Sequence, residues 1–284
     1  MGVRRVGVVG LGTMGAGIAQ VCVQAGFETV GREVSAELGE RARGTVDHFL
    51  ARGVEKGRLS AEEKDAALGR LTTTTDLADL AGCDLVIEAI VEELDAKQAL
   101  FAELSTIAPE AILATNTSAL SVTDVASAAA RPERVVGLHF FNPAPVLPLV
   151  EVVRTEGTVA EVYEAAYAFA AALGKEPVRC SDTPGFVVNR VLIPLLNDCV
   201  RVLDEAGVTP EDLDRALRFG LNWPIGPCAL IYLIGIDVHV HASEALHAAL
   251  GEERMAPPER LVELQTRGDL GRKSGRGFFE YTAG

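Results

Sequence analysis

Two hydrophobic spacings alternate along the first two thirds of the chain. Short apolar runs at residues 5–9, 27–30, 84–90, 111–115, 134–140 and 147–153 alternate with stretches whose apolar residues recur every three or four positions. Continuous short runs are typical of buried parallel strands, and the wider spacing is typical of amphipathic helices. The alternation predicts an α/β fold, with a Rossmann-type, doubly wound and mostly parallel sheet covered by helices on both faces.

The pattern changes after the segment SDTPGF at residues 181–186. Strand-like runs end there, and residues 187–207 have the composition of a long helix that is apolar nearly all round. We therefore predict two domains, a nucleotide-binding domain at 1–183 and an all-helical domain at 184–284. A helix of this kind must be buried against something, and in so small a domain a second copy of the chain is the expected partner. The sequence thus predicts a homodimer formed through the helical domain.

Charge and cysteine content narrow the choice of partners. The net charge is −14, from 26 basic and 40 acidic residues, which argues against nucleic acid or an anionic membrane as the main partner. An anionic small ligand would need a local basic patch. The five cysteines are scattered without a CxxC pair, as in reduced proteins, and no apolar run reaches the roughly 18 residues that span a membrane. We expect a cytoplasmic protein.

A glycine pattern follows the first predicted strand and opens the first predicted helix. It consists of Gly10, Leu11, Gly12, Thr13, Met14 and Gly15. In a dinucleotide fingerprint the first glycine permits the tight turn, the second admits a diphosphate, and the third lets helix and strand pack closely. Glu33 ends the second predicted strand, where a carboxylate accepts the ribose hydroxyls of NAD and repels the 2′-phosphate of NADP, although Arg32 lies beside it. The alternative is a glycine-rich turn in an unrelated α/β unit.

Oxidation of an alcohol by NAD requires a base, because the cofactor accepts only the hydride. His139 is the best candidate, since it ends an apolar run, and Glu151 lies twelve residues later within a second apolar run. A buried carboxylate needs a partner, so the two side chains are expected to pair. The alternative is a structural pair that joins two strands.

Polar residues at two other places are candidates for ligand binding. Asn116, Thr117 and Ser118 end a predicted strand, and ligands bind at the carboxyl ends of parallel strands. The alternative is a turn capped by its own side chains. Asn189 lies in the long apolar helix, where it must hydrogen-bond to a substrate or to a neighbouring helix. His239 and His241 are two positions apart and cannot share one helical face, so no metal site is predicted.

Seven sequence blocks, in order, resemble the 3-hydroxyacyl-CoA dehydrogenase family, in particular the bacterial 3-hydroxybutyryl-CoA dehydrogenases. They are GLGTMGAGIAQ, DLVIEAIVEELDAK, ATNTSALSV, GLHFFNPAPVLPLVEVV, DTPGFVVNR, WPIGP and GRKSGRGFFEY. The resemblance covers nearly all of the chain. It implies a two-domain dimer that reversibly oxidises the hydroxyl group of (S)-3-hydroxyacyl-CoA thioesters with NAD.

The resemblance also assigns roles to individual positions. It implies that His139 is the catalytic base, that Glu151 orients it, and that Ser118 and Asn189 bind the substrate oxygen. The positions expected to contact the cofactor or the substrate thioester are Glu92, Lys97, Asn116, Asn142 and Lys273.

Two departures from the family pattern leave questions open. Ile231 and Tyr232 stand where relatives commonly carry a small residue followed by aspartate. Arg52, Lys56 and Arg58 supply the expected basic patch for coenzyme A, but they do not match the family one by one. A thioester held by an acyl carrier protein, or a sugar acid, therefore remains an alternative substrate. An alternative of another class is a catalytically silent structural relative.

Overall fold

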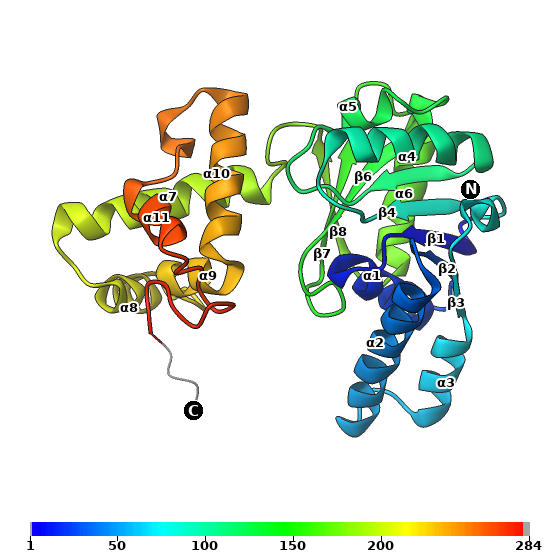
Figure 1. The fold of residues 1–284 in the computed structure, drawn as a ribbon, viewed down its shortest axis with the longest axis horizontal. Coiled ribbons are helices and arrows are strands. Elements are labelled where there is room, and N and C mark those ends of the chain that lie inside the picture. The colour runs from blue at the N-terminus through cyan, green and yellow to red at the C-terminus, as the bar shows by residue number, and fades with distance from the viewer. Residues whose placement is uncertain (1, 281–284) are drawn as a thin grey trace. The chain divides into compact units, whose positions relative to one another are not determined.

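The computed structural model describes residues 2–280 and divides the chain into two compact units, the N-terminal unit (residues 1–183) and the C-terminal unit (residues 184–284) (Figure 1). The described part of the N-terminal unit contains one eight-stranded sheet in the order β3-β2-β1-β4-β5-β6-β7-β8. The strands are β1 Arg5–Val9, β2 Glu28–Arg32, β3 Leu71–Thr74, β4 Leu85–Glu88, β5 Ile112–Thr115, β6 Val135–Phe140, β7 Leu149–Arg154 and β8 Glu176–Ser181. Among these strands β6 and β7 pair antiparallel and the other neighbours pair parallel. The predicted Rossmann-type architecture is confirmed.

Helices of the N-terminal unit bury the apolar faces of the sheet. They are α1 Thr13–Gln24, α2 Ala36–Glu55, α3 Ala61–Gly69, α4 Leu94–Ile107, α5 Val122–Ala126 and α6 Ala160–Ala172, with short 3₁₀ turns at Leu77–Leu80 and Pro132–Arg134. Ile18 of α1 and Phe169 of α6 belong to one buried cluster with alternate strand residues such as Val8, Ile87 and Leu138. Alternate strand residues face the same side of a sheet, so these two helices cover one face. Because β1, β2, β4 and β5 pair parallel, their carboxyl ends lie along one edge of the sheet.

Local sequence signals fix several helix starts. Ser60 and Glu63 form the capping box predicted for α3, each side chain bonding the other's backbone N–H. Thr209 caps α8, and Pro210 occupies its first position, also as predicted. These short-range signals are satisfied within one helical turn, which explains why the sequence alone could place them.

Helices alone make up the regular structure of the described C-terminal unit. They are α7 Val188–Ala206, α8 Pro210–Leu221, α9 Pro227–Ile234, α10 Ile236–Leu250 and α11 Glu259–Thr266, with a 3₁₀ turn at Glu253–Met255. The departure from the family pattern lies in the core of this unit, where Ile231 is fully buried and packs with Leu196 and Val200. The Tyr232 ring lies 6.1 Å from that of Phe279. Over residues 2–280 no single helix is long and apolar enough to cross a membrane. Only α9 and α10 taken together meet the length and composition needed, and they are bent by 96° relative to each other.

Helix α7 differs from its predicted character. Ile193, Leu196 and Val200 form a buried stripe, but a second stripe of apolar residues remains exposed within this chain. It consists of Val191, Leu195 and Val202, at 63%, 36% and 40% exposure. The helix is therefore amphipathic rather than buried on all sides, because Arg190, Asp198 and Arg201 interrupt its apolar surface.

Candidate active site

The glycine turn between β1 and α1 has the geometry of a diphosphate cradle. Gly10 adopts φ +84°, which glycine tolerates best, and a Cβ atom at Gly15 would lie 1.8 Å from the Gly10 carbonyl oxygen. A Cβ atom at Gly12 would meet nothing within 4 Å, so the backbone is open to a ligand there. The first turn of α1 carries no acidic residue and, within the described chain, no side chain caps it. A helix start of this kind favours an anion, and the residues fit NAD.

Glu33 is fixed beside this turn at the end of β2. Its two carboxylate oxygens accept hydrogen bonds from the backbone N–H groups of Leu11 (2.7 Å) and Val34 (2.9 Å). The neighbouring Arg32 directs its Nε to the carbonyl oxygen of Thr75, at 3.3 Å. The carboxylate, rather than the guanidinium, is thus tied to the glycine turn.

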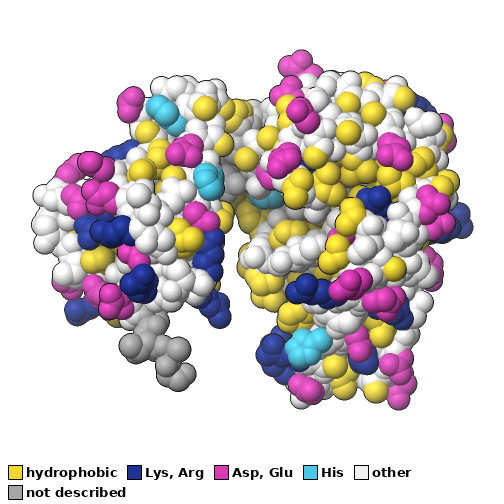
Figure 2. Space-filling model, viewed as in Figure 1, with side chains coloured by type: hydrophobic (Ala, Val, Ile, Leu, Met, Phe, Trp, Pro, Cys, Tyr) yellow, Lys and Arg dark blue, Asp and Glu magenta, His cyan; other side chains and the backbone are white. Residues whose placement is uncertain are grey.

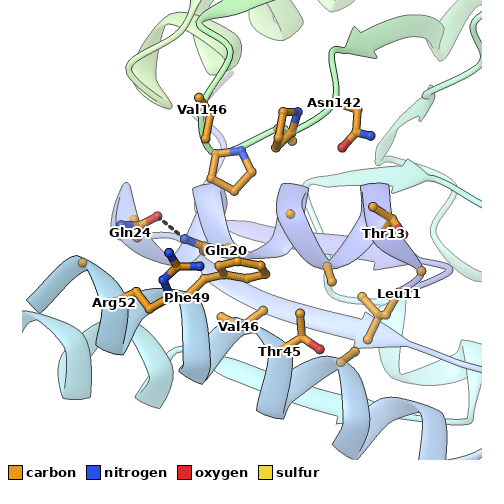
Figure 3. A pocket seen from close by; sticks show the side chains of 18 of the residues that line it. Leu11, Thr13, Gln20, Gln24, Thr45, Val46, Phe49, Arg52, Asn142 and Val146 are labelled. Atoms are coloured by element: carbon orange, nitrogen blue, oxygen red, sulfur yellow. Dashed lines mark hydrogen bonds between the residues drawn. The ribbon is translucent and has the colours of Figure 1, made fainter. Parts of the chain in front are cut away.

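A cavity of about 890 Å³ extends from the glycine turn along α1 and α2. Leu11, Thr13 and Asn142 lie at one end, and Arg52 lies at the other (Figure 3). Phe49 and Arg52 project from α2 toward α1, below the proline-rich turn that carries Asn142 (Figure 3). The cavity therefore joins the predicted nucleotide turn to the predicted basic patch.

Four cations line this cavity without an acidic partner. Arg52, Lys56 and Arg58 were singled out from the sequence, whereas Arg41 was not. Over residues 2–280 none of the four forms an ion pair within 4.0 Å. Lys and Arg side chains lie on the face of the N-terminal unit around α2, with acidic and apolar side chains among them (Figure 2). In a chain of net charge −14, four uncompensated cations around one cavity favour an anionic ligand.

His139 and Glu151 face each other across the antiparallel pair β6·β7. The two residues are direct cross-strand partners, and the His139 Nδ1 atom lies 2.7 Å from Glu151 Oε2. Both side chains are buried, with 6% of His139 and none of Glu151 exposed. An ionised carboxylate only accepts hydrogen bonds, so pairing with Glu151 favours the tautomer that carries its proton on Nδ1 and leaves Nε2 as an acceptor.

The turn after β5 carries Asn116, Thr117 and Ser118. Asn116 Oδ1 accepts a hydrogen bond from the Phe140 N–H at 2.9 Å, which links this turn to the residue after His139. Ser118 Oγ lies 3.4 Å from Glu92 Oε1. The structure thus places four predicted site residues on adjacent strands and their turns, namely Asn116, Ser118, His139 and Glu92.

Three other predicted site residues, Lys97, Lys273 and Asn189, lie outside the turn after β5 and the β6·β7 pair. Lys97 is only 1% exposed and forms ion pairs with Glu88 and Glu92, at 2.5 and 3.2 Å. The Lys273 ammonium pairs with Asp237 of α10. Asn189 lies in the first turn of α7, and both it and Lys273 belong to the C-terminal unit.

Lys175 is a residue that the sequence analysis missed. Its Nζ donates hydrogen bonds to the carbonyl oxygens of Ala144 (2.5 Å) and Leu147 (2.8 Å), within the turn that begins at Asn142. The side chain is 9% exposed, and burial lowers the pKa of its ammonium group. A lysine just before a strand gives no signal that it will be buried, because lysine is usually a surface residue.

Comparisons with known proteins agree with this geometry. Residues 5–183 match the family model "3-hydroxyacyl-CoA dehydrogenase, NAD binding domain", and residues 185–281 match "3-hydroxyacyl-CoA dehydrogenase, C-terminal domain". The chain is 43% identical to the probable 3-hydroxybutyryl-CoA dehydrogenase of Deinococcus radiodurans, over 97% of this chain and 99% of that one. It is 45% identical to the 3-hydroxyadipyl-CoA dehydrogenase of Escherichia coli, over 99% of this chain and 60% of that one.

Solved structures extend the likeness to three dimensions. The crystal structure of (S)-3-hydroxybutyryl-CoA dehydrogenase from Ralstonia eutropha is 38% identical, with a TM-score of 0.96 over 99% of this chain and 100% of that one. The two family models together account for nearly the whole sequence, in the order expected from the seven sequence blocks. The chain therefore belongs to the 3-hydroxyacyl-CoA dehydrogenase family.

Proposed function

We propose that this chain interconverts (S)-3-hydroxyacyl-CoA and 3-oxoacyl-CoA thioesters with NAD, and that 3-hydroxybutyryl-CoA is among its substrates. The observation that carries the proposal is the buried His139–Glu151 pair in a chain with an NAD-binding domain. The names of relatives support a CoA thioester, and they include both a butyryl and an adipyl chain. The acyl length is therefore a matter for assay.

The residues of this chain supply the proton chemistry. NAD, when bound, would supply the acceptor for the hydride that leaves C3 of the hydroxyacyl group. His139 Nε2 takes the hydroxyl proton, and Glu151 stabilises the imidazolium that forms, as the buried carboxylate does in hydrolase triads. In the reductive direction the imidazolium polarises the keto oxygen and returns the proton. Ser118 and Asn189 are proposed to hydrogen-bond the substrate oxygen.

Cofactor contacts are proposed for the residues around the glycine turn. The segment 10–15 would receive the diphosphate, and Glu33 would accept the ribose hydroxyls. Asn116, Asn142 and Glu92 lie on neighbouring turns of the N-terminal unit. Because Glu33 repels a 2′-phosphate, we expect NADH to be preferred over NADPH by at least about 10-fold in kcat/KM. Equal turnover with NADPH would contradict this role for Glu33.

The direct test is an assay of NADH consumption with acetoacetyl-CoA, with a His139→Ala variant as the control. The proposal predicts turnover by the natural chain and a loss of at least about 100-fold in the variant, which lacks the acid–base group. Absence of turnover in the natural chain would contradict the proposal and favour a catalytically silent relative. Faster turnover of an acyl-carrier-protein thioester or a sugar acid would favour the alternative substrates.

Recognition of coenzyme A is proposed for the cationic end of the cavity. Replacing Arg52, Lys56 and Arg58 together by alanine should raise KM for acetoacetyl-CoA, while KM for a truncated acetoacetyl thioester stays nearly unchanged, because the lost contacts are remote from the reacting carbon. Lys64→Ala is the matched control, since Lys64 lies on α3 but pairs with Asp47 at 2.7 Å. An equal effect on both substrates would place the three cations in another role.

We propose that the chain forms a homodimer through the C-terminal unit. The exposed stripe of α7, with Val191, Leu195 and Val202, is the kind of apolar surface that a second copy would bury. Sedimentation at micromolar concentration should give twice the chain mass of 30.0 kDa. A Val191→Asp, Leu195→Asp variant should sediment as a monomer. A monomeric natural chain with full activity would refute the proposal.

A further inference from the structure

Lys97 is a buried cation in the N-terminal unit whose surroundings connect it to the substrate-facing turn. Lysine is almost never fully buried unless it is paired, and Lys97 has two acidic partners. The first, Glu88, is itself fully buried at the end of β4. Its carboxylate also accepts hydrogen bonds from Thr115 Oγ1 and from the Ile90 N–H, both at 2.8 Å. Glu88 is thus an internal anchor, fixed by β4, β5 and the chain after β4.

The second partner, Glu92, divides its two carboxylate oxygens between Lys97 and the turn after β5. Oε2 lies 3.2 Å from the Lys97 Nζ. Oε1 accepts hydrogen bonds from Thr117 Oγ1 (2.5 Å), the Ser118 N–H (2.8 Å) and the Ala119 N–H (3.1 Å). Burial opposes ionisation of Glu92, but Lys97 and these hydrogen bonds outweigh it, and its pKa is lowered. One carboxylate therefore ties the backbone of Ser118 to the Lys97 ammonium.

The turn needs such an anchor because it lies beyond the hydrogen-bond ladder. The last residue of β5 is Thr115, and Asn116 still donates its N–H to the Glu88 carbonyl oxygen at 2.9 Å. Ser118 follows two residues later. Without Lys97, two carboxylates would remain close together with no cation between them, and Glu92 would lose the attraction that holds it in place.

We propose that Lys97 is a positioning residue for the reaction. Held by Glu88, it fixes the Glu92 carboxylate, and through it the Ser118 hydroxyl that binds the substrate oxygen. The inference rests on the proposed function, which assigns that role to Ser118. It replaces the expected contact of Lys97 with cofactor or thioester by an indirect role, in agreement with its 1% exposure.

The experiment is a double-mutant cycle on kcat with acetoacetyl-CoA. Lys97→Met keeps the length of the side chain and removes its charge, and we expect kcat to fall about 10- to 100-fold, as for a small misplacement of a reacting group. In a Ser118→Ala background the same change should cost less than about 3-fold, because residues that act as one unit are not additive. KM for NADH should change little. Lys64→Met, which breaks an exposed ion pair with Asp47, should leave kcat unchanged.

Two results would overturn the inference. One is a wild-type kcat in Lys97→Met, and the other is a double variant whose fold-loss in kcat equals the product of the two single fold-losses, that is, additive free energies. A raised KM for NADH with additive losses would instead restore direct cofactor binding. If Ser118→Ala itself retains wild-type kcat, the role of Ser118 in the proposed function fails, whatever Lys97 does.

Because Lys97→Met leaves Glu88 buried without its cation, this variant can fail to fold. Glu92→Gln then decides the matter, since it leaves the Glu88–Lys97 pair intact and removes the charge that Lys97 attracts. KM for NADH is measured beside kcat, because an unchanged KM separates the positioning role from loss of the cofactor contact proposed for Glu92. We expect it to lower kcat and to be non-additive with Ser118→Ala. Wild-type kcat in folded Glu92→Gln, or additive losses, would overturn the inference.

Discussion

The two units each bury a histidine, and the two histidines have different partners. His139 pairs with a carboxylate across two strands, whereas His239 of α10 lies 2.9 Å from the amide oxygen of Asn197 on α7. His239 is 1% exposed, and over the described residues its Nδ1 has no hydrogen-bond partner. Burial lowers its pKa from 6.5 to about 4.

The difference shows that burial alone does not give a histidine acid–base chemistry. An ionised carboxylate stabilises an imidazolium, so Glu151 would let His139 hold a proton in the proposed reaction. The neutral amide of Asn197 gives no such compensation, and it donates its own N–H groups to backbone carbonyl oxygens, including that of Met255 at 3.1 Å. His239 is therefore a neutral packing residue that joins α10 to α7, and Asn197 extends the link to the turn after α10.

The largest effect is expected from a substitution that removes the charge from the His139–Glu151 pair. Glu151→Gln keeps the shape of the side chain and removes its charge, so kcat/KM for the hydroxyacyl substrate should fall by about 100-fold or more. The acid limb of its pH profile should also move to lower pH, because the imidazolium loses its stabiliser. If the pair only joins strands, the variant should melt at a lower temperature while kcat and the acid limb stay unchanged.

A smaller effect concerns stability in acid. Above pH 6.5 His239 is neutral in both the folded and the unfolded chain. As the pH falls from 6.5 toward 4, the unfolded chain takes up a proton that the folded chain excludes, so folding stability is lost over this window, by roughly 2 to 3 kcal/mol at pH 4.5. His239→Gln should abolish this part of the acid dependence in urea unfolding while leaving the kcat/KM profile unchanged. The same acid dependence in the variant would mean that His239 does not titrate as described.

The smallest effect is expected from a substitution that gives His239 a carboxylate partner, as His139 has. Asn197→Asp offers His239 a carboxylate, which should let it protonate in the folded chain and reduce the loss of stability in acid. The variant loses the donors to the Met255 carbonyl oxygen, so we expect it to be less stable at pH 7 by about 1 to 2 kcal/mol. Urea unfolding at pH 7 and pH 4.5 measures both the stability at neutral pH and its loss in acid. An unchanged acid dependence would show that a carboxylate alone does not determine the behaviour of a buried histidine.

Short-range signals made much of the fold predictable from the sequence. The glycine turn, the capping box of Ser60 and the start of α8 at Pro210 depend on residues a few positions apart. The pairing of His139 with Glu151 was also predictable, because two strand-like runs with one ionisable residue each need a partner for the carboxylate. Their roles in the reaction stay predictions.

Long-range packing could not be predicted in the same way. The histidines of the C-terminal unit lie in helices with mixed neighbours, and nothing local distinguishes buried His239 from exposed His241. Lys97 and Lys175 are buried only because distant acceptors, on β4 and in the turn after Asn142, receive their ammonium groups. The antiparallel direction of β7, by contrast, follows from its eight-residue connection to β6, which is shorter than a parallel crossover requires.

The antiparallel pairing of β6 with β7 bears on which parts of the neighbouring chain can change in sequence. His139 and Glu151 are fixed opposite each other by the backbone ladder of two strands whose buried residues prevent slippage. The eight residues from 141 to 148 that join these strands lie outside this ladder. Natural variants or engineered chains could therefore change side chains of this segment, and with them one wall of the cavity, while His139 stays opposite Glu151.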